Sequence, residues 1–232
     1  MNSRIISPEN DFSAKAPFSI QEGRCREALA RFFLSLPPAG QQSDAQRAAY
    51  RAALRLLHRL EIRSVLQNAA LPRPLLFGDL YGMLRELLTA CRRLLDGAGV
   101  TVSLHLPQAL PPVAAGIEPR ITAMAAVALF RCAVQAGAAR ASLTATPEQV
   151  MLTFSAAHAW EQPEVSALAR EAARLHRGCF IQSGNVAALS FHAAAVHTGR
   201  WYIPPTADVL LRDPLSPVHI GLCDGELAQG GD

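Results

Sequence analysis

The feature that most constrains this fold is a change in hydrophobic spacing near residue 100. Apolar residues recur at helical spacing between Asp79, a favourable N-cap residue, and Gly97, which ends the pattern. The next segment, Val100–Leu106, instead alternates between apolar and polar residues, as a half-buried strand does. A helix followed directly by a strand predicts a mixed α and β core. The helical face comprises Leu80, Met83, Leu84, Leu87, Leu88, Cys91, Leu94 and Leu95.

The chain after this strand continues with alternating helices and hairpins. Residues 107–117 are rich in proline and predict a loop. The helix that follows is apolar almost all round and should be the most buried. Antiparallel hairpins with helices on one side predict an α+β two-layer sandwich. The expected elements are a helix at Pro119–Ala136, strands at Arg140–Thr146 and Val150–Ser155, a helix at Pro163–His176, and strands at Cys179–Gln182 and Ala187–Phe191.

Two further helices are expected before residue 79, at Ile20–Leu36 and Asp44–Ala70. The short proline-containing loop between them predicts an antiparallel helical hairpin. We therefore divide the chain into a flexible N-terminus, 1–17, a hairpin, 18–74, a sandwich, 75–193, and a tail, 194–232. The tail receives no assignment beyond one candidate strand at Val218–Leu222.

The composition excludes several classes of protein. The 232 residues carry a net charge of only +3, which does not by itself indicate nucleic-acid binding. The five cysteines are far apart, so neither a disulfide framework nor a zinc site is expected. The longest apolar stretch, Ile121–Ala139, is interrupted by Arg131 and Gln135, and no signal peptide is visible. These features predict a cytoplasmic setting without a membrane span or a metal site.

Several segments between residues 79 and 193 resemble the ATPase domain shared by gyrase, Hsp90, histidine kinases and MutL. The resemblance implies the two-layer sandwich of sensor histidine kinases. The hairpin lies where such kinases keep their dimerisation and phosphoacceptor helices, so it implies a homodimer formed through 18–74. The matching segments are Asp79–Leu88, Gly99–Val102 and Pro111–Val113, then Ala128–Ala136 for the asparagine-box helix, and Ala167–Gly178 for the helix after the second glycine box.

The positions that bind ATP in that family carry other residues here. Arg131 and Gln135 stand at the two asparagine positions, and an arginine cannot coordinate magnesium. The first glycine box corresponds to Ser155–Trp160, which includes Ala157 and has neither aspartate nor glycine. Only Glu161–Glu164 remains of the lid. We expect the fold to persist without an ATP and magnesium site, because glycine-rich backbone is what admits phosphates.

Histidines offer weak candidates for chemistry. His58 is on the second helix, whereas the resemblance places the phosphoacceptor on the first, so a surface or interface role is the simpler interpretation. His176 ends a helix, where the dipole favours a cationic imidazole. The spacing of the other histidines does not match a metal site. They are His105, His158, His192, His197 and His219.

Arginines recur at every fourth position of the second helix, and the row spirals slowly around it. Such a row is either a solvated face or a docking surface for an acidic partner, for example a response-regulator-like domain. Aromatic residues are not interleaved with it, which disfavours single-stranded nucleic acid. The row comprises Arg47, Arg51, Arg55, Arg59 and Arg63.

Three hypotheses of function follow from these features of the sequence. The first is a non-catalytic relative of sensor histidine kinases that acts as a binding or scaffold module in signalling. The second is a divergent but active histidine kinase or phosphotransferase that binds ATP. The third is an adaptor that docks an acidic partner through the arginine row. All three share one fold, so the site must separate them.

Overall fold

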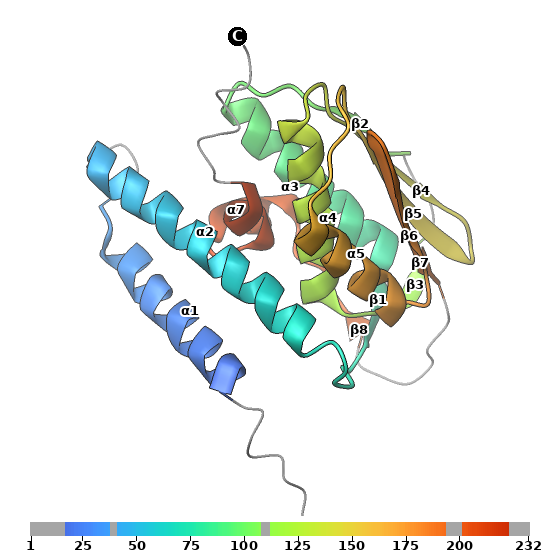
Figure 1. The fold of residues 1–232 in the computed structure, drawn as a ribbon, viewed down its shortest axis with the longest axis horizontal. Helices are drawn as coiled ribbons and strands as arrows, with labels where there is room; N and C mark the ends of the chain where they lie inside the picture. Colours follow the sequence, from blue (N-terminus) through green and yellow to red (C-terminus); the bar gives the residue numbers. More distant parts are fainter. Residues whose placement is uncertain (1–16, 38–40, 108–111, 194–200, 223–232) are drawn as a thin grey trace, which may run out of the picture.

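A five-stranded sheet forms one layer of the molecule. The computed structural model describes residues 17–37, 41–107, 112–193 and 201–222 (Figure 1). The strand order is β2-β4-β5-β7-β6, with β2 parallel to β4 and the other neighbours antiparallel. This order contains both predicted hairpins. The strands are β2 (Ser103–His105), β4 (Arg140–Ala145), β5 (Gln149–Ser155), β6 (Phe180–Ser183) and β7 (Val186–His192).

Three helices cover one face of this sheet: α3 (Leu80–Gly97), α4 (Pro119–Gln135) and α5 (Pro163–Leu175) (Figure 1). The covered face of β5 presents Val150, Leu152 and Phe154, all fully buried, as period-two alternation requires. The rings of Phe130 on α4 and Phe154 meet edge to face with centroids 5.9 Å apart. These contacts confirm the predicted α+β two-layer sandwich, with α4 as its central helix.

A second, smaller sheet with the order β3-β1-β8 was not predicted. It joins β1 (Leu76–Asp79), β3 (Ala114–Ile117) and β8 (Trp201–Tyr202). The loop expected at 107–117 is therefore wrong for 114–117, and the strand expected at 100–106 is shorter than predicted. The four-residue strands β1 and β3 contain glycine and little alternation, and β8 has only two residues, so only pairing between distant segments defines these strands.

The candidate strand at Val218–Leu222 is also wrong, because these residues belong to helix α7 (Pro217–Leu222), which follows α6 (Ala207–Arg212). Val218, Ile220 and Leu222 have the alternating spacing of a strand. In the structure Gly221 is buried as well, because other elements cover most of this short helix. A Cβ on Gly221 would lie 2.3 Å from Val127 of α4, so only glycine permits the close packing of α7 on α4.

The predicted helical hairpin consists of α1 (Pro17–Ser35) and α2 (Asp44–Gln67), and a capping box between Ser43 and Gln46 starts α2. The hairpin packs on the sandwich through α7, which lies beside α2 (Figure 1). Leu54 and Leu57 of α2 are buried against Ile220, with Leu29, Phe33, Tyr50 and Leu215 around them. Of the N-terminal segment and the tail, residues 1–16, 194–200 and 223–232 lie outside the described residues, as do His197 and Cys223.

Gly178 supports a stability prediction. A Cβ at this position would lie 1.8 Å from the Ser190 carbonyl oxygen, so Gly178→Ala must move backbone and should destabilise the fold by about 2 kcal/mol or more. Gly97→Ala is the matched control, because nothing lies within 4 Å of its Cβ, and should change stability by no more than about 1 kcal/mol. Urea denaturation of both variants tests this, and equal midpoints would contradict it.

Candidate functional site

The positions that resemble a nucleotide site gather at the C-terminal end of α4. Gln135 is the last residue of that helix and is exposed. The chain turns there through Gly137 and Ala138, whose φ angles are 83° and 45°. Ala157, in the loop after β5, donates its amide hydrogen to the Gly137 carbonyl at 2.7 Å. The structure therefore places Gln135 and Ala157 at the same end of the helix.

The loop at 156–160 is fixed on both sides by its own backbone. The amide of His158 donates to the Ala136 carbonyl at 3.1 Å, on the same side as Ala157. The amides of Ala156 and Trp160 donate to the carbonyls of Asn185 and Gly184, at 3.0 and 3.4 Å, in the turn between β6 and β7. A phosphate-binding loop must direct its amides at the anion. Here four of the five loop amides point at protein carbonyls instead.

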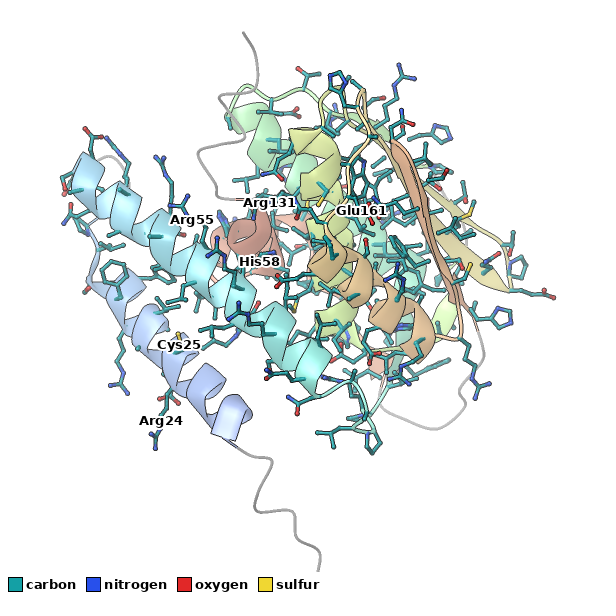
Figure 2. All side chains as sticks on the ribbon, in the orientation of Figure 1. Arg24, Cys25, Arg55, His58, Arg131 and Glu161 are labelled. Carbon is teal, nitrogen blue, oxygen red and sulfur yellow. The ribbon has the colours of Figure 1, made fainter. Side chains whose placement is uncertain are left out.

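Arg131 lies one turn before Gln135 and is directed toward the hairpin (Figure 2). It is half-buried and close enough to His58 of α2 for its charge to lower the pKa of that imidazole. The larger cause is burial, and together with Arg59 these effects lower the pKa of His58 to about 4. The residue at the first asparagine position thus faces α2 rather than an open pocket.

His58 is buried between the hairpin and the sandwich, with 8% of its surface exposed. Its low pKa makes the imidazole neutral at pH 7. A phosphoacceptor must be reached by a phosphoryl donor in solution or on a partner. The buried His58 meets that requirement only if the hairpin moves away.

The arginine row does not form one continuous exposed surface. Arg51, Arg59 and Arg63 are exposed, whereas Arg55 is half-buried (Figure 2). Arg47 is exposed and pairs with Asp44 at 2.5 Å. The row therefore spirals partly toward the sandwich, as the helical repeat requires, and leaves Arg47, Arg51, Arg59 and Arg63 exposed.

The cationic state expected for His176 is wrong. The side chain is 3% exposed, and burial lowers its pKa. Its Nδ1 lies 2.7 Å from the Ala172 carbonyl and donates to it, so Nε2 is free to accept the amide hydrogen of Glu118 at 3.1 Å. A neutral imidazole satisfies both partners, and His176 therefore fastens α5 to the start of α4.

Glu61 was not predicted from the sequence. It is 1% exposed on the buried face of α2, where it pairs with Arg26 of α1 and lies 3.7 Å from Arg120 of α4. A glutamate at helical spacing from Leu57 and Val65, both apolar and buried, was the signal that could have revealed it. One buried carboxylate thus links three helices.

The described residues contain no group of three or more histidine, cysteine, aspartate or glutamate side chains that could hold a metal ion. Among the helices in the described ranges, none is both long and apolar enough to span a bilayer. A cavity of about 380 Å³ beside Trp160 and Phe180 and one of about 340 Å³ beside Arg26 and Arg120 are lined by other residues than Arg131, Gln135 and Ala157.

Comparisons with known proteins found similarity at the level of structure. No family model and no curated protein sequence matches the chain. The chain is similar to a histidine kinase from Burkholderia phymatum STM815, with 20% identity and a TM-score of 0.43 over 75% of this chain and 99% of that chain. It is also similar to the histidine kinase AdeS of Acinetobacter baumannii, with 13% identity and a TM-score of 0.45 over 76% and 94%. Because both TM-scores are low, the fold assignment rests on the strand order and helix layer.

His58 generates a prediction about pH. Its pKa falls from 6.5 to about 4 on folding, so its contribution to stability is complete above pH 6.5 and is lost as the pH falls toward 4. The loss should be about 3 kcal/mol. His58→Gln removes this titration, so its free energy of unfolding should fall less than that of the wild type over the same range. His176 remains in both proteins and cancels in the difference. Urea denaturation across this pH range measures both, and parallel curves would contradict the prediction.

Proposed function

We propose that this chain is a non-catalytic, histidine-kinase-like module that binds other proteins in signalling. The observation that carries the proposal is the state of the loop at 156–160. Its amides at Ala156, Ala157, His158 and Trp160 are all engaged by backbone carbonyls. An ATP triphosphate would have to displace these hydrogen bonds without a glycine-rich segment to replace them.

The side chains at the degenerate positions support the same proposal. Magnesium on a triphosphate requires oxygen ligands from the protein or from water. Of Arg131, Gln135 and Ala157, only Gln135 carries a side-chain oxygen. Arg131 is a cation directed at His58 of the docked hairpin. This arrangement favours a nucleotide-free module over the alternative of an active kinase or phosphotransferase, for which His58 would also have to become accessible.

Thermal unfolding with millimolar ATP and magnesium tests the proposal. A nucleotide at a hundred times its dissociation constant stabilises a protein by about 2.7 kcal/mol and raises Tm by about 2–4 °C for a chain of this size. We expect no shift beyond that produced by magnesium alone. Arg131→Asn restores an amide at the first asparagine position and should also show no shift, because the loop amides stay engaged. A shift in the wild type would overturn the proposal and favour the kinase hypothesis.

The hairpin is the proposed surface for a homodimer. Ala49, Ala52 and Leu56 are exposed and share one face of α2 by their spacing, and Leu56 is 54% exposed. The exposed Arg59 and Arg63 border this face by their spacing and would suit an acidic partner such as a response-regulator-like domain, whereas the exposed Arg51 lies further round the helix. Both partners would thus use the outer side of the hairpin, which the sandwich leaves uncovered.

Leu56→Asp tests the dimer, because a carboxylate placed in an apolar interface loses its hydration. We expect the dimer dissociation constant to rise at least about tenfold, equivalent to about 1.4 kcal/mol. Ile181→Asp on β6 is the control, since Ile181 is 62% exposed on a different surface, and should leave the constant unchanged. Light scattering after size-exclusion chromatography measures both against the 24.9 kDa protomer. A monomeric wild type across micromolar concentrations would refute the dimer.

A further inference from the structure

A cavity of about 340 Å³ lies where the hairpin, the start of α4 and the C-terminal segment meet. Its volume falls within the range of small-molecule sites. It is lined by residues from α1, α3, α4 and the segment 202–217, so four separate parts of the chain form its wall. None of the positions that resemble the nucleotide site belongs to it, since those lie at the opposite end of α4.

The greater part of the wall is apolar. Met83 and Leu87 of α3, Ala123 of α4 and Leu210 of α6 line it, and each is less than a tenth exposed. Val209, which also lines the cavity, is 53% exposed and lies toward solvent. An apolar wall with an exposed residue at its edge is suited to the hydrocarbon part of a ligand that enters from solvent.

Two arginines supply the charged part of the wall. Arg26 and Arg120 both line the cavity, and both are directed toward the single carboxylate of Glu61, which lies behind them. Two guanidinium groups therefore share the wall with a single carboxylate behind them, so the pair of arginines presents cationic groups to the cavity. The Nε of Arg26 is buried and has no hydrogen-bond partner among the described residues. Burial also lowers the pKa of Arg120, which an added anion would counteract.

One acidic residue of the wall opposes an anion, against two guanidinium groups and two hydroxyls that favour it. Asp213 is the one acidic residue that lines the cavity, and its carboxylate accepts the amide hydrogen of Leu215 at 2.9 Å. Burial raises the pKa of Tyr202, so its hydroxyl stays protonated and can donate. Ser216, which is 2% exposed, adds a second hydroxyl. The wall thus combines hydrogen-bond donors at its polar side with an apolar remainder.

We propose that this cavity binds a small apolar carboxylate, with its head group at Arg26 and Arg120 and its hydrocarbon part against Met83, Leu87 and Leu210. Guanidinium groups bind carboxylates through two parallel hydrogen bonds, which gives the head a defined orientation. Arg26 comes from the hairpin and Arg120 from the sandwich, so the bound carboxylate holds the two together. The ligand therefore stabilises the docked hairpin.

The test uses octanoate as the probe and octan-1-ol as its matched neutral control, in calorimetric titrations of the full chain. We expect octanoate to bind with a dissociation constant at or below about 1 mM and octanol at least about tenfold more weakly. Hydrogen exchange should show octanoate protecting the backbone of α1, α3, the start of α4 and α6. Absence of octanoate binding, equal binding of octanol, or protection confined to other elements would each overturn the proposal.

Two variants distinguish binding in the cavity from nonspecific hydrophobic binding. Val209 is exposed, so the fold should tolerate Val209→Glu. The new carboxylate on the wall should weaken octanoate binding at least about tenfold by charge repulsion. The pair Arg26→Gln with Glu61→Gln removes one guanidinium without leaving its carboxylate unpaired, and should weaken octanoate but not octanol. Undiminished octanoate binding in Val209→Glu would overturn the proposal. Titration with ATP is a separate measurement, so either proposal can fail alone.

Discussion

The packing of α7 between the hairpin and α4 is the contact on which the rest of the molecule depends. Ile220 closes a cluster with Leu54 and Leu57 of α2, and Gly221 lets the helix approach Val127 of α4. A six-residue helix has little stability alone and forms because both sides are covered. Once it forms, α2 must lie along the sandwich, which buries His58 and places Glu61 beside Arg26 and Arg120. Ile62 and Val65 of α2 then join the main apolar core of the sandwich, while Leu54 and Leu57 form a second cluster with Ile220.

The sandwich could be predicted from sequence because its elements carry strong local signals. The caps and apolar face of α3, the alternation in β5 and the turn at Gly184 each act over a few residues. The small sheet and α7 could not be predicted, since their segments take their structure from partners far along the chain. Residues 218–222 have the apolar spacing of a strand but form a helix, because their packing against other elements determines their structure. The local sequence pattern determines the type of secondary structure in long, periodic elements. In short elements, contacts with distant segments determine it.

The site was predictable in part. Gln135 and Ala157 lie at one end of α4, and the absence of glycine from residues 155–160 is visible in the sequence. The hydrogen bonds that engage the loop amides depend on backbone geometry and could not be foreseen. The neutral state of His176 also depends on two partners from α4 and α5 that the local helix-dipole argument ignores. Glu61, by contrast, could have been recognised from local sequence alone. A single charged residue among apolar helix positions indicates a buried ion pair even before its partner is known.

The two ends of α4 differ in what they offer to an anion, and this difference underlies both proposals. The carbonyls of Ala136 and Gly137 at its C-terminal end need donors, and the amides of Ala157 and His158 supply them. Those amides cannot also bind a phosphate, so capping the helix and cradling an anion exclude each other there. At the N-terminal end, Arg120 lines the cavity together with Arg26, and the Glu61 carboxylate lies 3.7 Å from Arg120. Any anion that this helix recruits should therefore bind at the N-terminal end, where the helix dipole also favours negative charge.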